Sequence, residues 1–319
     1  MVSGATQGDT GMAFETPAPV RGAIRSSLRL AGALAMAAAL TACQSVGPLE
    51  EPTQDFVAAA NALAVAEADY FDQIQAASDA GHRLRAVATF TGGPDAGTFA
   101  AFRTEFLKRD DFSKAKAVRL NAIAQLQNYA QAVSEIQGGG QATWVADQTG
   151  AVIANANSLA QSGGLTGLDQ EAAGLAQKIV ATLGQAILDH ASARKMQELA
   201  ASAREPIGQL ERMVAEDQKN LEDDKYVASL GTDQRDAMLN ALHIIFDDRR
   251  VTAADRFGVA LEAADRKPLL VTKARAIHAS MAKLKAANEA MAQGQKLTAK
   301  ALFKQAEDLA DLAASAGGK

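Results

Sequence analysis

The chain has 319 residues, with 32 Lys and Arg against 37 Asp and Glu and a net charge of −5 at pH 7. This acidic balance excludes a general attraction for nucleic acid, which requires a basic surface that displaces counterions from phosphates. Aromatic residues make up only 5% of the chain, while alanine and leucine are abundant. Since alanine and leucine strongly favour helices, the composition predicts an all-α protein.

The first 42 residues have the three parts of a secretory signal. Arg21, Arg25 and Arg29 form a cationic segment, and a short apolar run follows over residues 30–42. A transmembrane helix needs about 20 apolar residues to cross about 30 Å of hydrocarbon. Because this run is shorter, we expect a cleaved signal peptide rather than a membrane span.

The apolar run ends in Leu40-Thr41-Ala42-Cys43, and Cys43 is the only cysteine of the chain. This motif resembles the lipobox of bacterial lipoproteins. The resemblance implies that signal peptidase cuts after Ala42 and that the Cys43 thiol carries a diacylglyceryl group. An ordinary cysteine beside a conventional cleavage site is the alternative. Each buried methylene of an acyl chain contributes about 0.8 kcal/mol, so two or three chains would hold the protein on a bilayer.

The residue after the cysteine bears on localisation. In some bacteria an aspartate at this position favours retention in the inner membrane, and here it is Gln44. We therefore expect a lipid-anchored protein of the cell envelope, at the outer membrane and facing the periplasm. Cleavage removes three arginines and two acids, which leaves a net charge of −6.

The remaining chain divides into a lipidated tether, residues 43–54, and a helical bundle, residues 55–316, with a possible subdivision near residues 205–232. Gly47, Pro48 and Pro52 are typical of a short linker. We predict an elongated antiparallel bundle with coiled-coil-like seams, because apolar residues recur at helical spacing throughout.

The sequence pattern predicts four helices in the first half of the bundle. One covers residues 55–80 and ends at Gly81, and a short one carries Phe99, Phe102 and Phe106. The third is capped by Ser113 and ends at a run of three glycines, residues 138–140. These glycines lack the Lys-Ser or Lys-Thr that a phosphate-binding loop requires. The fourth helix covers residues 144–161.

In the next segment, the pattern predicts a long helix that begins at a capping box of Thr166 and Asp169. Pro206 either kinks this helix or starts a new one. The apolar stripe then continues through Leu210, Met213, Val214 and Leu221. Further helices are expected around Met238, Leu242 and Ile245, and after a second capping box of Thr252 and Asp255.

The clearest heptad pattern covers residues 268–293. Its inward positions alternate by four and three residues: Leu270, Ala274, Ile277, Met281, Leu284, Asn288 and Met291. This spacing predicts a coiled-coil seam, in which Asn288 would lower stability and determine register. A last helix follows Gly294, with Leu297 and Leu302 as a hydrophobic staple around Thr298 and an inner face of Leu302, Ala306, Leu309 and Ala313.

Catalytic and metal-binding patterns are weak. The four histidines, His82, His190, His243 and His278, lack the Glu-x-x-His spacing of di-iron bundles. His243 and Asp247 would share a helix face but supply too few ligands for a metal. No serine lies in a Gly-x-Ser-x-Gly motif. A pair of catalytic carboxylates of the glycosidase type stays an open alternative, because its spacing exists only in the folded chain. We expect no cofactor and no enzymatic activity.

Charge is unevenly distributed along the second half. Residues 266–304 contain nine basic residues and one acid, Glu289, whereas residues 205–224 are mainly acidic. Either the two segments pack together and offset their charges, or the basic segment contacts an anionic surface or partner. For the second alternative, Lys296, Lys300 and Lys304 would line one helical face as contacts to phosphates or lipid headgroups.

These observations predict a membrane-anchored envelope lipoprotein that acts as a non-enzymatic scaffold or accessory factor. Its partners would be the membrane, through Cys43, and an envelope protein or a second copy. The alternative is a periplasmic carrier of a small apolar ligand or lipid, in a cavity lined by Met281, Phe246 or Tyr129. A closed core would favour the scaffold and an apolar cavity would favour the carrier.

Overall fold

The computed structural model describes residues 52–89, 96–138, 143–161, 168–191, 195–223 and 266–316. Regular structure in these ranges is entirely α-helical, which confirms the all-α fold. The signal peptide, Ala42, Cys43 and the helices expected around Met238 and Thr252 lie outside the described residues. Among the described helices, none combines the length and apolar character needed to cross a bilayer.

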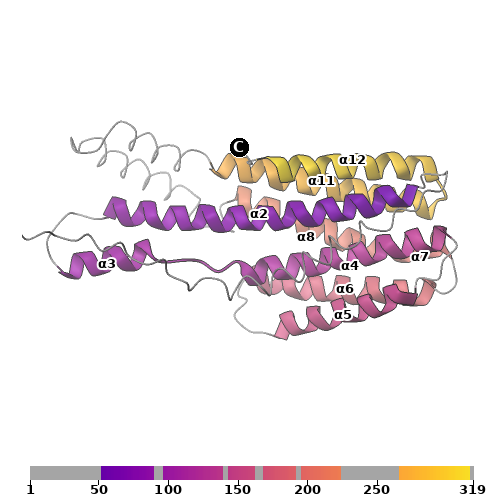
Figure 1. Ribbon diagram of the computed structural model, residues 1–319, viewed down its shortest axis with the longest axis horizontal. Coiled ribbons are helices and arrows are strands. Elements are labelled where there is room, and N and C mark those ends of the chain that lie inside the picture. Colours follow the sequence, from indigo (N-terminus) through magenta and orange to yellow (C-terminus); the bar gives the residue numbers. More distant parts are fainter. Residues whose placement is uncertain are drawn as a thin grey trace, which may run out of the picture. The chain divides into compact units, whose positions relative to one another are not determined.

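The described helices, labelled as in Figure 1, have the following bounds: α2 Pro52–Thr89, α3 Ala96–Phe106, α4 Ser113–Gln137, α5 Thr143–Gln161, α6 Leu168–Ala191, α7 Met196–Ser202, α8 Arg204–Glu222, α11 Arg266–Ala292 and α12 Lys296–Ser315. They belong to one compact unit, Leu49–Lys319.

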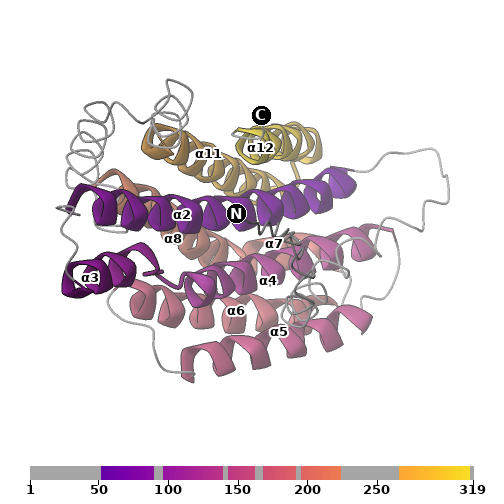
Figure 2. The ribbon, with the colours of Figure 1, turned by 60° about the vertical axis from the view of Figure 1, so that its left-hand side comes forward.

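Helix α2 lies between two groups of helices (Figures 1 and 2). On one side it packs against the hairpin of α11 and α12, and on the other it packs against α4, which in turn contacts α5 and α6. Helix α8 packs against both α6 and α11 and so joins the two groups. The bundle therefore has a central helix that takes part in both halves of the core.

Helix directions follow from contacts between named side chains. Phe56 of α2 contacts Tyr129, and Asp72 of α2 contacts Lys116, so α2 and α4 are antiparallel. Phe56 also stacks on Phe303 of α12 at 4.3 Å between ring centroids. Helices adjacent in sequence are antiparallel within the α4–α5–α6 group and in the α11–α12 hairpin, whereas α2 and α12 run in the same direction.

The core consists largely of alanine with a few large side chains. All seven residues of the predicted heptad seam in α11 are buried, and Asn288 is fully buried among them. Its amide bonds the Tyr129 hydroxyl and donates to the Ala200 carbonyl at 2.9 Å. The seam is confirmed, and Asn288 joins α11 to both α4 and α7.

One glycine in the core is required by close packing. A Cβ atom at Gly184 of α6 would lie 2.9 Å from side-chain carbons of Ile153 and Thr149 on α5. Real Cβ atoms do not approach carbon this closely, because dispersion attraction turns into repulsion below about 3.5 Å. Gly184 thus allows α5 and α6 to pack at their observed separation.

Helix α2 does not end where the sequence suggested. It continues through Gly81 to Thr89, so the predicted end at Gly81 was wrong. A glycine inside a helix costs about 1 kcal/mol relative to alanine. The buried contacts of His82 with α3 and the loop after it, described below, offset that cost.

Two predicted helix starts also differ. Ser113 does not cap α4; it is the first helical residue, and its backbone N–H donates to the Asp111 carboxylate at 2.9 Å. Leu297, a proposed staple residue of α12, is 85% exposed. Ala306 and Ala313 of the predicted inner face are buried, but Ala299, Phe303 and Ala310 complete the face, and Leu302 and Leu309 are only partly buried, so the face is rotated slightly towards Phe303. Phe303 decides this rotation, because it stacks on Phe56.

Candidate functional site: a buried charge cluster

Arg119 is the largest fully buried side chain of the described core. It lies on α4, one residue after the buried Val118. Its Nε donates to Asp217 Oδ2 at 3.0 Å, and its Nη2 donates to Asp217 Oδ1 at 2.8 Å. Its Nη1 donates to Asp169 at 2.9 Å. One guanidinium thus bonds α8 and the first turn of α6.

Helix α2 completes the surroundings of Arg119. The guanidinium carbon lies 5.5 Å from the ring centroid of Phe71, within the range of a cation–π contact. Four helices therefore meet at Arg119. Paired carboxylates and an aromatic face compensate for the cost of removing its charge from water.

Glu67 and Tyr70 lie one turn apart on α2, beside this pair, and both are 2% exposed. Burial, together with the negative charge of Asp217, raises the pKa of Glu67 from 4.5 to about 8, and Arg119 partly opposes the shift. Burial also raises the pKa of Tyr70 well above its usual value of 10. At neutral pH, the Glu67 carboxyl is therefore mostly protonated and adds little negative charge to the cluster of Glu67, Tyr70, Arg119, Asp169 and Asp217.

The chemistry open to the charge cluster follows from its enclosure. A carboxyl whose pKa is near neutral suits acid–base work, but only within about 3 Å of a reacting group. Glu67, Tyr70, Arg119 and Asp217 are each at most 5% exposed. No group of three or more His, Cys, Asp and Glu suitable for a metal occurs in the described part of the chain. The geometry is that of a cluster that determines how four helices associate.

A second buried cation joins the other half of the bundle. Lys273 of α11 is fully buried; its Nζ bonds the Asp69 carboxylate of α2 and donates to the Ala313 carbonyl at 2.7 Å. Carbonyls in the last turn of a helix lack intrahelical partners, and a cation there also interacts favourably with the helix dipole. Lys273 therefore fixes the end of α12 against α2 and α11.

His82 forms a polar cluster near the far end of α2. Its Nδ1 lies 2.9 Å from Glu105 of α3, its Nε2 lies 3.0 Å from Asp110, and Arg85 Nη2 lies 2.9 Å from Nδ1. The hydrogen bond from His82 lowers the pKa of Glu105. Although burial opposes it, hydrogen bonds from Ser78 and His82 lower the pKa of Asp110 as well. These contacts hold α3 and the loop after it on α2.

The acidic and basic segments noted in the sequence lie against each other. Arg275 of α11 pairs with Glu222 of α8 at 2.9 Å. Glu211 of α8 accepts from His278 at 3.0 Å and from Lys285 at 3.4 Å. Despite opposing burial, these contacts lower the pKa of Glu211. Packing between α8 and α11 therefore accounts for part of the uneven charge.

The three lysines predicted to contact an anionic surface lie in the first half of α12. Lys296 is exposed and Lys300 is partly buried. Lys304 forms ion pairs within its own helix, with Glu307 at 2.8 Å and Asp308 at 3.3 Å. The structure thus keeps these lysines on one side of α12 but offsets the charge of Lys304.

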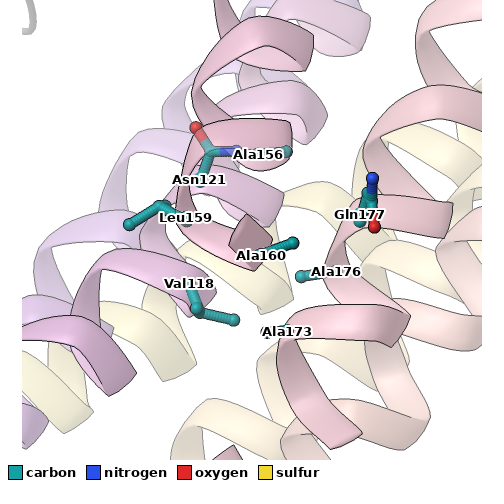
Figure 3. A pocket seen from close by; sticks show the side chains of 8 residues that line it. All are labelled: Val118, Asn121, Ala156, Leu159, Ala160, Ala173, Ala176 and Gln177. Atoms are coloured by element: carbon teal, nitrogen blue, oxygen red, sulfur yellow. The ribbon is translucent and has the colours of Figure 1, made fainter. Parts of the chain in front are cut away.

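A shallow depression lies between α4, α5 and α6 (Figure 3). The space of about 170 Å³ between its lining atoms is open to solvent, and the depression encloses no volume that a water-sized molecule could occupy. Typical small-molecule sites have about 300–1,000 Å³. Its lining residues are mostly small: Val118, Asn121, Ala156, Leu159, Ala160, Ala173, Ala176 and Gln177. Two candidates for lining a carrier cavity, Met281 and Tyr129, are fully buried within the core instead, and the third, Phe246, lies outside the described residues.

Glu67, Arg119 and Asp217 of the charge cluster were not singled out from the sequence, and Asp169 was singled out only as part of a capping box, although one signal of a buried cluster was present. Asp217 continues the stripe of Leu210, Met213, Val214 and Leu221 on α8 at helical spacing, and Glu67 lies four residues after Leu63 and three before Tyr70. A charge at an inward position predicts a buried pair.

Comparisons with protein families, with curated proteins and with solved structures found no match to this chain.

Proposed function

We propose that this protein is a lipid-anchored lipoprotein of the bacterial cell envelope that acts as a non-enzymatic helical scaffold or accessory factor. The observation that carries the proposal is the lipobox-like Leu40-Thr41-Ala42-Cys43 at the end of a short apolar run, in a chain with no other cysteine. The anchor is the acylated Cys43 thiol, and the expected place is the outer membrane, facing the periplasm.

The bundle supports the scaffold part of this proposal. Its buried charged groups are used in contacts between helices: Arg119 joins α4, α6 and α8, and Lys273 joins α2, α11 and α12. Removing the acidic partners of either cation would leave its buried charge uncompensated. A bundle held in this way presents fixed helical faces, which suits a protein that positions a partner. An envelope protein or a second copy is the expected partner.

The anchor is tested with Cys43→Ser in the full-length chain. We expect the wild-type protein to incorporate labelled fatty acid and to sediment with membranes, and Cys43→Ser to lose both the label and the shorter mature form. Ser45→Ala, two residues further on, is the matched control and should behave as wild type. A Cys43→Ser protein that is processed and membrane-bound like wild type would refute the anchor.

The scaffold role is tested by mild crosslinking in cells, followed by recovery of the anchored protein. We expect one defined crosslinked product, either with an envelope protein or with a second copy, that is recovered from wild type and reduced in Cys43→Ser. Recovery of the monomer alone under conditions that crosslink a known envelope complex would count against a scaffold.

A further inference from the structure

Helix α3 lies at the margin of the bundle, beside the end of α2 that carries His82 (Figures 1 and 2). Glu105 in its last turn and Asp110 in the loop after it both bond His82, so these two acids point towards α2. Arg103 and Leu107 are each two residues from Glu105, which places them on the opposite side of α3. The acids therefore face inward, and we call the side that carries Arg103 and Leu107 the outward side of α3.

The outward side of α3 ends in two adjacent exposed apolar side chains. Leu107 is 60% exposed and Phe106 is 37% exposed. The Leu107 N–H donates to the Arg103 carbonyl at 3.0 Å, so the backbone holds Leu107 in the last turn. In the described ranges, the other large hydrophobic residues of comparable exposure are isolated in the sequence: Val65, Leu188, Leu297 and Leu312. Isolated exposed residues are common on protein surfaces, whereas grouped ones indicate a contact.

Positive charge lies beside these apolar side chains. Residues 103–109 contain three basic residues, Arg103, Lys108 and Arg109, and a single acid, in a chain whose net charge is −5. All three cations are exposed. Arg109 lies 3.9 Å from Asp79, but its side chain is 70% exposed. Cations at the end of a helix interact favourably with the helix dipole. This effect accounts for the charge but not for the exposed apolar residues between the cations.

Exposed apolar side chains beside cations are typical of segments that lie in the headgroup region of a membrane. The apolar groups enter the boundary of the acyl chains, and the cations stay near the lipid phosphates. Two apolar side chains and three cations would hold a free protein only weakly. A protein that is anchored beside the bilayer is always at a high local concentration of lipid, so that a weak contact becomes effective.

We propose that the outward side of α3, with Phe106, Leu107, Arg103, Lys108 and Arg109, contacts the anionic headgroups of the bilayer in which the protein is anchored. This inference rests on the proposed lipid anchor. The protein is then held at the membrane in two places, by its acyl chains and by α3.

This contact determines the orientation of the bundle, which the tether alone leaves open. Pro52 is nine residues after Cys43, so the start of α2 lies within about 32 Å of the anchor. His82 is 30 residues after Pro52, about 45 Å along α2. With α3 at the bilayer, α2 therefore cannot stand upright on the membrane and lies tilted towards its plane.

The test uses the anchored protein, purified with its lipid and reconstituted into phosphatidylethanolamine–phosphatidylglycerol vesicles that contain brominated lipid. Leu107→Cys introduces a thiol that is labelled with a fluorescent probe, since acylated Cys43 does not react. Leu312→Cys is the matched control, because Leu312 is similarly exposed, at 57%. It lies on α12 only nine residues after Phe303, which stacks on Phe56 at the end of α2 opposite to α3. We expect brominated lipid to quench the probe at position 107 several-fold more than at position 312.

The role of charge is tested in the labelled Leu107→Cys protein. Without phosphatidylglycerol, or with Arg103→Gln/Lys108→Gln/Arg109→Gln, we expect the quenching at position 107 to fall to the level at position 312. A variant with the same loss of charge elsewhere should quench like the parent: Lys178→Gln/Lys195→Gln/Arg212→Gln. Thermal unfolding identifies variants that keep the wild-type fold, and only these are compared.

Each result has a distinct meaning. Equal quenching at positions 107 and 312, in protein that floats with the vesicles, overturns the bilayer contact and leaves the anchor intact; an acidic protein then becomes the alternative partner of this surface. Quenching at position 107 that persists without phosphatidylglycerol and in the triple variant overturns the contact with anionic headgroups. Two labels per chain, or protein that does not float with vesicles, overturns the anchor and the contact with it.

Discussion

Arg119 on α4 and Asp217 on α8 are 98 residues apart in the sequence and form a two-bonded ion pair inside the core. Paired hydrogen bonds of this geometry are both strong and directional. Because Arg119 also bonds Asp169 and faces Phe71, the pair determines the relative register of four helices. Alanine contacts alone would leave that register poorly defined, since small side chains interlock less than large ones.

Removing one partner of this pair is expected to be far more harmful than removing both. Asp217→Ala should lower the free energy of unfolding by about 3–5 kcal/mol, because Arg119 would stay buried without its main partner. The double variant Arg119→Met/Asp217→Leu should lose much less. Denaturant titration measures both. Glu222→Gln, which breaks the exposed pair with Arg275, is the control and should change stability little; additive losses in the double variant would contradict the coupling.

Glu67 is expected to make the bundle less stable as the pH rises. Its pKa is about 8 in the folded chain and near 4.5 when exposed. Between these values, the folded state binds more protons than the unfolded state, so stability falls with pH by up to about 1.4 kcal/mol per unit. Above about pH 8 the loss is complete.

Glu67→Gln should therefore flatten this part of the stability profile and stabilise the protein at pH 8 more than at pH 5. Denaturant midpoints at pH 5, 6.5 and 8 provide the measurement. Glu216→Gln, a change at a carboxyl elsewhere in the bundle, serves as the comparison. A wild-type profile that rises from pH 5 to pH 8, with the same rise in Glu67→Gln, would show that Glu67 is ionised when folded.

Lys273→Met should loosen the end of α12. The substitution removes the hydrogen bond to the Ala313 carbonyl and leaves Asp69 without its lysine partner. We expect a loss of about 2–3 kcal/mol, in the range of hydrogen bonds to charged groups, and faster hydrogen exchange at residues 310–315. Lys283→Met on the same helix, where the side chain is half-buried, should leave that exchange unchanged. Uniform acceleration along α12 would argue for general destabilisation instead.

Acid should release α3 from α2. The lowered pKa values of Glu105 and Asp110 mean that these carboxylates contribute stability that is present above the unfolded values of 4.5 and 3.8. This contribution is lost as the pH falls through the lower folded values. Amide exchange over α3, corrected for intrinsic rates, should be slow at pH 6 and faster near pH 3. His82→Ala should already be fast at pH 6. The same protection at both pH values would be inconsistent with this account.

The seam of α11 could be predicted from the sequence because one period persists over seven positions, from Leu270 to Met291. The partners of Asn288 could not, since Tyr129 and Ala200 reach it only through the register of α4 and α7. The predicted helix end at Gly81 was wrong because local sequence did not decide it. The helix-breaking tendency of glycine was outweighed by contacts of His82 with residues 23 and 28 positions away. The predicted staple contact of Leu297 was wrong for a similar reason, because the stacking of Phe303 on Phe56 determines the rotation of α12.

The charge cluster could be predicted only in part. Asp217 and Glu67 lie on apolar stripes, which marks them as inward-facing, but the choice of Arg119 as the shared partner depends on how α2, α4 and α8 associate. Charge patterning did better at a coarser level: one alternative from the sequence, that the acidic and basic segments pack together, agrees with the Arg275–Glu222 and Lys285–Glu211 pairs.

Because α2 continues through Gly81, one uninterrupted helix connects the two ends of the bundle. Phe56 and His82 are 26 residues apart on one helix, which corresponds to about 39 Å along its axis. A tilt of about 10° at Phe56 would displace His82 by about 7 Å, and α3 would move with it. Because α2 packs against α4, α11 and α12, such a tilt would turn the bundle as one body, and α3 would move through a larger distance than the residues near Phe56.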